Sequence, residues 1–312
     1  MLNRRQLRIK SMEIIYSYEN SNDKQIDKQI AFLKTSTESF YHLYVFMISF
    51  FIEFKNHCDD RLVNSKKKFL EDKSFIFYFN VSKNSFLNKI ASNTILKEKI
   101  GFYKIKYWKE YPDHLQELVK KIEQKNFFSS NEKKANLDFE SERKQIIWVF
   151  KKVIACDPKL YDFVEESYLS WPNDFALVNS LIINNLKIIK RYSKSILFKS
   201  IYKNKKDINF GTKLIECNIE NDKFIKTEIN NVIDNWDVER IAKIDMVLLK
   251  MCVTEFIYFK DIPIKVSINE YLDIAKDYSS LKSNVFINGV LDKLSKNFKQ
   301  KGVINKSKKG NK

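Results

Sequence analysis

The sequence is poor in the residues that make turns, bind metals or form disulfides. Only 5 of its 312 residues are glycine and 4 are proline, whereas sheet-rich folds need many turns that draw on both. The 4 cysteines are widely spaced and form no CxxC pair, and with 3 histidines they offer no metal-ligand spacing. We therefore expect an all-α protein of long helices that holds no metal and keeps its cysteines reduced.

The sequence also lacks a hydrophobic run long enough to cross a membrane. Its most apolar stretch, LYVFMISFFI at 43–52, is ten residues long, about half of what a bilayer-spanning helix requires. The N-terminal MLNRRQLRIK has no apolar core of a signal peptide. We expect a soluble cytoplasmic protein with no membrane partner, in which 43–52 is a buried helix segment.

Sequence patterns typical of catalytic sites are missing as well. The chain contains no glycine-rich phosphate loop, no nucleophile elbow and no paired-carboxylate site. Glu270 follows Asn269, but one carboxylate without a histidine, a metal or a second acid is poor support for acid–base chemistry. We predict no catalytic residue, no cofactor and no enzymatic activity.

What the chain does contain is positive charge. The net charge is +17, with 44% hydrophobic and 14% aromatic residues, enough to build a core. Such a balance favours a polyanionic partner, with nucleic acid first. Only 7 of the 56 basic residues are arginine, and lysine, asparagine and isoleucine abound. Codon drift in an AT-rich genome therefore stays open as a second explanation of the charge.

The N-terminal segment combines arginines with an aromatic ring. Apolar or small residues at three- and four-residue spacings predict a helix over 3–18. Arg4, Arg5 and Arg8 share one side of it, and Tyr16 lies eleven residues after Arg5, close to three turns. Cations in a first helical turn are unfavourable, which suggests a use outside the helix. Guanidinium groups beside a phenol ring suit single-stranded RNA, although a solvated basic helix is the plainer alternative.

A second group of residues joins two predicted helices, 267–279 and 283–299. The group consists of Tyr278, Lys282, Ser283, Asn284 and Phe286. Ser283 could cap the second helix and leave backbone N–H groups that attract phosphate. Tyr278 and Phe286 could stack on bases, whereas the spacing of Phe286 with Val290 and Leu294 also fits a core residue.

Three further features have structural interpretations. Ser267 and Glu270 fit a capping box at the start of a helix. Gly289 lies inside an amphipathic helix, where close helix packing would explain it, and Asn288 would satisfy buried backbone groups. The acids around 238–259, including Glu239, Asp245 and Glu255, indicate an exposed acidic edge.

Two parts of the chain resemble one protein family. The C-terminal strings NWDVERIAKIDMVLLKMC and DIPIKVSINEYLDIAKDYSSLKSNVFINGVLDK, together with the N-terminal MLNRRQLRIKSMEIIYSYE, resemble the NusB family of bacterial transcription antitermination factors. The length points to a long variant of the kind familiar from a Bacteroidetes-like lineage. The resemblance implies a NusB-like helical bundle of two subdomains with a long helical insertion.

The resemblance also implies partners and sites. It predicts binding of boxA-type single-stranded ribosomal RNA and of the ribosomal protein NusE, with RNA polymerase engaged indirectly. The RNA-binding residues would be Arg4, Arg5, Arg8, Tyr16, Tyr278, Lys282, Ser283 and Phe286, and Asp245 and Glu239 would contact the protein partner. Gln6 stands where the family often has a further basic residue, and Lys282 stands where several members have an acidic or small one.

Domain boundaries follow from the same resemblance. We predict a NusB-like core formed by 1–20 and 207–299, a helical insertion over 21–206 that partly completes the N-terminal bundle, and a basic disordered tail over 300–312. Two other functions remain open: an RNA-binding accessory domain related to ribosomal-RNA methyltransferases, which 5 glycines disfavour, and a protein-interaction scaffold.

Overall fold

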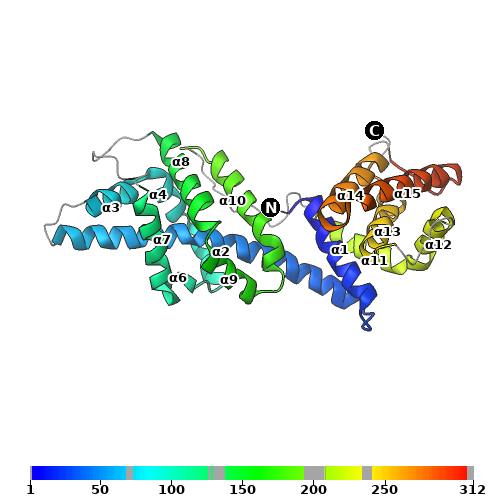
Figure 1. Ribbon diagram of the computed structural model, residues 1–312, viewed down its shortest axis with the longest axis horizontal. Helices are drawn as coiled ribbons and strands as arrows, with labels where there is room; N and C mark the ends of the chain where they lie inside the picture. Colours follow the sequence, from blue (N-terminus) through cyan, green and yellow to red (C-terminus); the bar gives the residue numbers. More distant parts are fainter. Residues whose placement is uncertain are drawn as a thin grey trace. The chain divides into compact units, whose positions relative to one another are not determined.

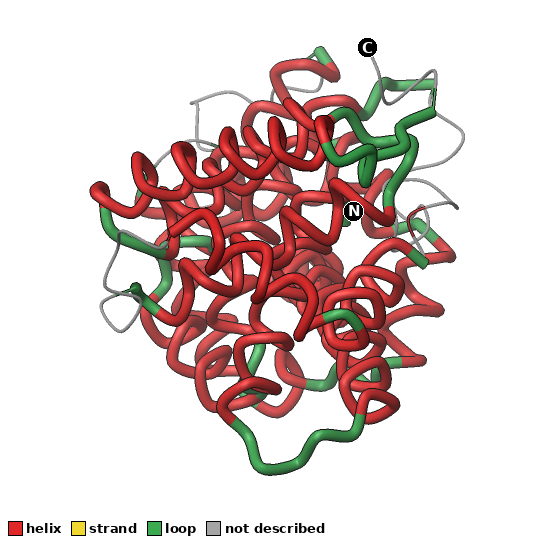
Figure 2. The backbone as a smooth tube through the Cα atoms, turned by 90° about the vertical axis from the view of Figure 1, so that its right-hand side faces the viewer, coloured by secondary structure: helices red, strands yellow, loops and turns green. Residues whose placement is uncertain are grey.

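The computed structural model describes residues 2–67, 73–125, 128, 138–192, 207, 209–233 and 241–307. Within these ranges the chain forms helices and connecting loops, with no strand (Figure 2). The prediction of an all-α protein is confirmed. No helix in the described ranges is long and apolar enough to span a bilayer.

The chain divides into two compact units, Met1–Thr37 with Ile201–Lys312, and Glu38–Ser200 (Figure 1). We refer to them as the terminal unit and the central unit. Helix α2, Ile26–Lys67, contributes its residues through Thr37 to the terminal unit and the remainder to the central unit.

The terminal unit is built around one buried helix. Almost every residue of α13 (Lys243–Tyr258) from Val247 to Phe256 is shielded from solvent. The helices packed against it are α1 (Arg4–Asn20), α11 (Phe210–Glu220), α12 (Asp222–Ile233), α14 (Ile264–Tyr278) and α15 (Leu281–Gln300). This arrangement brings the first helix of the chain against helices that follow it by about two hundred residues.

A close approach fixes α11 against α1 and α2. A Cβ atom on Gly211 would lie 2.9 Å from Leu33 Cδ2 and 3.4 Å from Ser11 Oγ, so only glycine fits there without a shift. Gly289 behaves differently, because a Cβ atom on it would have no neighbour within 4 Å, and both Asn288 and Gly289 are exposed. The predictions of close packing at Gly289 and of buried contacts for Asn288 were therefore wrong.

The central unit is organised by the remainder of α2. All ten residues of 43–52 are buried, which confirms the predicted buried helix segment. Four aromatic rings lie around Phe46 with centroids 5.3 to 6.0 Å from its own: Tyr107, Trp108, Phe163 and Trp171. Tyr107 and Phe163 also contact each other, at 4.2 Å. Around α2 lie α3 (Lys73–Lys83), α4 (Ser85–Ala91), α5 (Thr94–Phe102), α6 (Tyr107–Glu110), α7 (Pro112–Gln124), α8 (Phe139–Val149) with the π-helical turn η1 (Phe150–Ile154), α9 (Pro158–Ser167) and α10 (Trp171–Ile188).

Two predicted helix starts are corrected. Helix α14 begins after Pro263, so Ser267 lies inside it and donates to Glu255 Oε2 at 2.8 Å instead of capping. Helix α15 is capped by Ser280, whose side chain accepts from the Ser283 backbone N–H at 3.2 Å. Serine spacing alone did not locate these boundaries, because the hydrogen-bond partner of each serine comes from the folded structure.

The chain beyond α15 packs back on α13. Lys306 is buried and donates to the carbonyl oxygens of Glu255 and Phe259, both at 2.9 Å, and Ser307 N–H donates to Lys260 O. Residues 301–307 are thus held by hydrogen bonds where disorder was predicted, and 308–312 lie outside the described residues.

Candidate nucleic-acid interface

Helix α1 starts with a capping box. The Asn3 side chain accepts from the Gln6 backbone N–H at 3.1 Å, and Gln6 Oε1 accepts from the Asn3 N–H at 2.8 Å. Both orphan donors are thereby satisfied. Gln6, which departs from the basic pattern, is committed to this cap and sets where the arginine-bearing helix begins.

Arg4 and Arg5 lie half-exposed beside this cap. Arg4 Nε donates to Asp207 Oδ1 at 2.8 Å, and its guanidinium stands 5.3 Å from the Phe210 ring centroid. Arg5 Nε and Nη2 donate to the two oxygens of Glu270 at 3.0 and 3.2 Å, and Nη2 also donates to Asp273 at 2.7 Å. Hydrogen bonding to Glu270 raises the Arg5 pKa above its ordinary value. With side chains 40% and 42% exposed, both arginines can be reached from solvent.

Arg8 lies below them and faces inward. Its side chain is 3% exposed, and Nε and Nη2 donate to Glu255 at 2.6 and 2.9 Å while Nη1 reaches Glu270 at 3.3 Å. Burial lowers the Arg8 pKa, but the charge and hydrogen bonds of Glu255, together with Tyr271 and Glu270, raise it more, so the net shift is upward. Arg8 therefore holds α1 in place, and direct RNA contact by Arg8 stays a prediction that its burial does not support.

Glu255 is the centre of this cluster. It is fully buried and accepts from Arg8, from Ser267 Oγ and from Tyr271 Oη, each at 2.6 to 2.9 Å. Buried carboxylates need such partners. The sequence offered one signal for it, a single acid inside the apolar stretch MCVTEFIYF, and the expectation that Glu255 forms an exposed edge was wrong.

Tyr16 lies toward the other end of α1. Its ring is 39% exposed and lines a pocket of about 290 Å³ together with Glu19, Asn20, Ile241, Lys243, Met246 and Val247. Helix α1 and the first turn of α13 form this pocket. Lys243 Nζ, at its edge, donates to Asn20 Oδ1 at 2.7 Å.

The first turn of α13 also holds the connection between α14 and α15. Ser279 Oγ donates to Asp245 Oδ1 at 2.5 Å, and Asp245 directly precedes two residues of the Tyr16 pocket. Tyr278, 40% exposed, lies one residue before Ser279, and Lys282 is exposed three residues after it. Tyr16 of the first predicted group and Ser279, the neighbour of Tyr278 in the second, thus both lie against the first turn of α13.

The remaining predicted residues are less accessible. Ser283 is buried and shares a hydrogen bond with Ser280 Oγ at 2.8 Å, and Phe286 is partly buried. Asp245 is 4% exposed, so it is no part of an exposed acidic edge, and Glu239 lies outside the described residues. Partner binding by these two acids stays a prediction.

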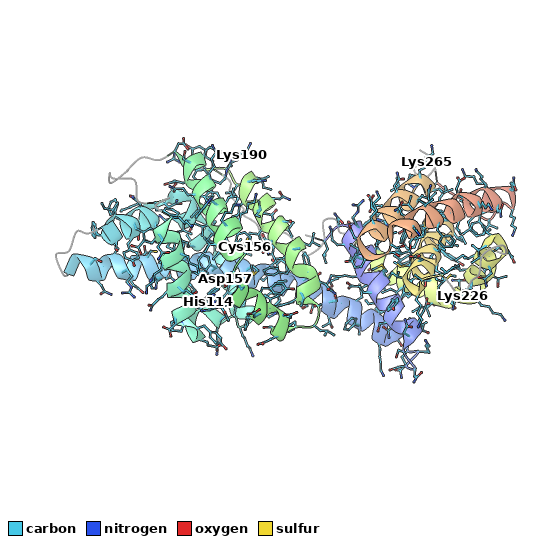
Figure 3. The ribbon with its side chains drawn as sticks, in the orientation of Figure 1. His114, Cys156, Asp157, Lys190, Lys226 and Lys265 are labelled. Carbon is cyan, nitrogen blue, oxygen red and sulfur yellow. The ribbon has the colours of Figure 1, made fainter. Side chains whose placement is uncertain are left out.

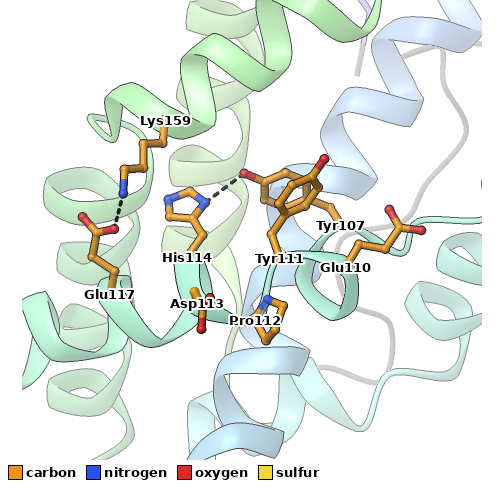
Figure 4. A pocket seen from close by; sticks show the side chains of 8 residues that line it. All are labelled: Tyr107, Glu110, Tyr111, Pro112, Asp113, His114, Glu117 and Lys159. Carbon is orange, nitrogen blue, oxygen red and sulfur yellow. Dashed lines mark hydrogen bonds and ion pairs between the residues drawn. The ribbon is translucent and has the colours of Figure 1, made fainter.

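The central unit holds a separate pocket beside α6 and α7 (Figure 4). It has a volume of about 390 Å³ and is lined by Tyr107, Glu110, Tyr111, Pro112, Asp113, His114, Glu117 and Lys159. Tyr107 Oη and His114 Nδ1 share a hydrogen bond at 2.8 Å, and His114 Nε2 bonds Asp157 Oδ1 at 2.9 Å.

This histidine cluster ties two helices together. Asp157, labelled with His114 in Figure 3, caps α9 through the Leu160 N–H at 3.0 Å and accepts from Lys121 Nζ at 3.0 Å. Burial raises the Asp157 pKa, but hydrogen bonds from His114 and Lys121 lower it more, so the carboxylate is held ionised. The cluster joins α7 to α9, and the described residues contain no group of three metal-ligating side chains.

Comparison with known proteins covers the C-terminal part of the central unit and most of the terminal unit. The family model described as the NusB family matches residues 176–296. This range takes in most of α10, which precedes the predicted core boundary at 207, then α11 to α14, and α15 up to residue 296. A transcription antitermination protein NusB of Clostridium botulinum is 36% identical over 115 residues, 36% of this chain and 80% of the relative. The chain belongs to the NusB family.

Other NusB relatives match over smaller shares of their length. The NusB protein of Chloroherpeton thalassium is 39% identical over 122 residues, 39% of this chain and 58% of the relative. That of Clostridium kluyveri is 42% identical over 95 residues, 30% of this chain and 61% of the relative. The chain thus spans about 60% of these two NusB proteins, and no solved structure matches it.

Proposed function

We propose that this NusB-family chain is a non-enzymatic, cytoplasmic RNA-binding adaptor in transcription antitermination. It would hold a boxA-type single-stranded RNA leader together with the ribosomal protein NusE and help RNA polymerase pass terminators in ribosomal RNA operons. The relatives named above carry the antitermination role. The observation that carries the RNA assignment is the pair of half-exposed guanidinium groups, Arg4 and Arg5, at the start of α1.

The geometry supports a track along the terminal unit. Arg4 and Arg5 would take phosphate groups, because the planar guanidinium grips phosphate oxygens in pairs. Tyr16 and Tyr278, each about 40% exposed, flank the turn of α13 and offer rings for base stacking. Lys282 adds an exposed charge beside Tyr278.

Arg5 also has an internal competitor for phosphate. Glu270 and Asp273 already occupy its N–H donors, so bound RNA must exchange carboxylate contacts for phosphate contacts. The exchange costs part of the affinity, because an ion pair is given up for each one formed. These acids therefore set how strongly Arg5 contributes to RNA binding.

The deciding test is RNA binding by an Arg5→Ala variant. We expect its affinity for boxA RNA to fall about tenfold, because a hydrogen bond to a charged group contributes about 1.5–3 kcal/mol. The slope of log affinity against log salt should become shallower by about 0.7 for the lost phosphate contact. Fluorescence anisotropy measures both quantities, with and without the NusE partner.

Lys226→Ala provides the matched control. Lys226 lies on α12, is 45% exposed and pairs with Asp222, so its removal takes away the same charge from another surface of the terminal unit (Figure 3). Equal affinities for Arg5→Ala, Lys226→Ala and the unchanged protein would contradict the site.

A further inference from the structure

The central unit carries a continuous row of aromatic rings that the proposed function does not use. Phe102 at the end of α5 packs edge-on against Tyr103, with ring centroids 5.0 Å apart. Tyr103 stacks on His42 of α2 at 4.6 Å and 8°, and His42 meets Tyr168 at 5.3 Å. Tyr168 in turn lies 4.5 Å from Trp171, the first residue of α10. We refer to these five residues as the ring row.

The ring row is buried at Trp171 and exposed to solvent at Phe102 and Tyr168. Trp171 is 2% exposed and its Nε1–H donates to Ser39 O at 3.1 Å, which fixes one end. Phe102 is 71% exposed and Tyr168 is 47% exposed, and Leu169 next to it is 93% exposed. Large apolar groups displayed in this way commonly mark a binding surface.

His42 completes the stack as a neutral ring. Burial among the aromatic rings lowers its pKa to about 4. At neutral pH the imidazole therefore carries no charge, and it packs flat against Tyr103 as a further aromatic face. The row thus presents ring faces and edges without a fixed positive charge of its own.

Positive charge gathers at the Phe102 end of the row. Lys97, Lys99, Lys104 and Lys106 lie within ten residues, and Lys99 Nζ stands 5.3 Å from the Phe102 ring centroid. Two exposed acids, Glu98 in the same segment and Glu38 near Tyr103, offset part of this charge. Lys104 adopts a φ of 52°, the left-handed conformation that closes the C-terminus of α5, where the Ile105 N–H donates to Ile100 O at 3.0 Å. The central unit as a whole holds 28 Lys and Arg against 20 Asp and Glu.

The opposite end of the row is acidic. Glu165 and Glu166 precede Tyr168 on α9, and both are exposed. Phosphate groups are therefore favoured over Phe102 and the lysines and disfavoured along α9, whereas the uncharged face of a base can still stack on Tyr168. The two ends of the ring row therefore differ in charge, which favours a charged partner over an uncharged apolar one.

We propose that the ring row is a second binding surface for single-stranded RNA, located on the central unit and separate from the arginines of α1. Bases stack on Phe102 and Tyr168, because every base offers a π face. Phosphates lie against the lysines of 97–106. Sequence preference is weak, since stacking and phosphate contacts do not read base edges. The site extends the contact with the transcript beyond the leader element of the proposed function.

The test uses the full chain and a fluorescein-labelled oligouridylate of about a dozen nucleotides, within the range that stacking surfaces cover. We expect Phe102→Ala with Tyr168→Ala to weaken binding at least tenfold, because base stacking contributes about 1–3 kcal/mol per base. Tyr161→Ala is the matched control. It removes a ring of similar exposure, 38%, from α9.

A second readout locates the RNA directly. An oligouridylate containing 4-thiouridine should crosslink to peptides with Phe102 or Tyr168, and the double substitution should abolish these crosslinks. Circular dichroism checks that the variant stays folded. The same measurements in an Arg5→Ala background separate the two surfaces, because oligouridylate binding through the ring row should persist there.

Three outcomes would overturn the inference. The first is an affinity change below twofold in the double variant, and the second is an equal loss in Tyr161→Ala. The third is unchanged RNA binding with loss of binding to the NusE protein, which would make the row a protein-docking surface. Loss of boxA binding in Arg5→Ala, with oligouridylate binding unchanged, would support the proposed function and also support a separate ring-row site.

Discussion

At the scale of single residues, the three arginines of α1 occupy two kinds of environment. Arg4 and Arg5 are half-exposed and pair with Asp207, which is buried, and with Glu270, which is partly exposed. Arg8 is instead enclosed by Glu255 and two hydroxyl-bearing neighbours. The difference arises because Arg8 points toward α13 while the other two flank α11 and α14. Arginines that look equivalent in sequence therefore divide into two that solvent can reach and one buried structural anchor.

The acid beside Arg5 leads to a prediction for RNA affinity. Asp273→Asn removes one competitor for the Arg5 N–H donors while Glu270 keeps the side chain oriented. We expect boxA affinity to rise by up to about fivefold, since exposed ion pairs contribute about 0–1 kcal/mol. Anisotropy titrations measure the change. Asp292→Asn on α15, which removes the same charge from a pair with Lys296, should have a smaller effect; equal effects would point to net charge alone.

At the scale of elements, the charged residues of neighbouring helices decide which faces of a helix can be buried. Lys250 shows this on α13, where it is 1% exposed yet pairs with Glu19 of α1 and Asp222 of α12. The stem of such a lysine packs among apolar groups while its charge is satisfied by two acids. Helix α13 can consequently be buried on nearly all sides and still carry charged residues.

Helix α15 gives the second prediction. Gly289 lies in its exposed middle with no neighbour within 4 Å, so an added methyl group meets nothing. We expect Gly289→Ala to raise the free energy of unfolding by about 1 kcal/mol, because alanine favours the helix over glycine by that amount. Urea unfolding followed by circular dichroism measures it. A decrease in stability would show that the glycine serves a contact within the fold.

Helix α2 gives a prediction about pH. His42 has a folded pKa of about 4 against about 6.5 in an unfolded chain. Between these values the unfolded state binds more protons, so stability rises as the pH rises from about 4 to about 6.5. His42→Phe keeps a ring but binds no proton and should flatten part of this rise. Urea unfolding of both proteins at several pH values between about 4 and 6.5 measures the free energy of unfolding against pH. The same pH dependence in the variant and the unchanged protein would contradict the assignment.

At the scale of the whole molecule, the chain forms two compact units whose segments interleave in sequence. The terminal unit is assembled from both ends of the chain, and the central unit is one continuous segment, Glu38–Ser200. Each has its own buried centre, α13 in one and the aromatic cluster around Phe46 in the other. Positive charge is spread over both, which fits two surfaces for RNA.

Separate cores predict separable unfolding. Glu255→Gln should lower the stability of the terminal unit by about 3–5 kcal/mol, because it leaves Arg8 buried without its full counter-charge. Trp171→Ala should lower that of the central unit by about 3–5 kcal/mol through loss of buried ring contacts. Differential scanning calorimetry should show each substitution shifting one transition and leaving the other in place. A single transition shifted by both would show that the units unfold together.

Much of the fold could be predicted from the sequence because its signals are local. Few glycines and prolines with apolar residues at helical spacing indicated an all-α chain. The predicted helices at 3–18, 267–279 and 283–299 correspond to α1, α14 and α15 within three residues at each end. The apolar run 43–52 was correctly predicted as a buried helix segment. The family could be named from strings of adjacent residues for the same reason.

The sequence by itself therefore determined the helices, the family and the basic character of the chain. Only the tertiary structure decided which charged residues pair with one another and which are buried. Asp207, Glu255, Glu270 and Asp273 meet the arginines of α1 across separations of more than two hundred residues, and no spacing rule reaches that far. The ring row likewise gathers residues from 42, 102–103 and 168–171. Periodicity reports which face of a helix is apolar, whereas burial of a charge depends on what another helix places opposite it.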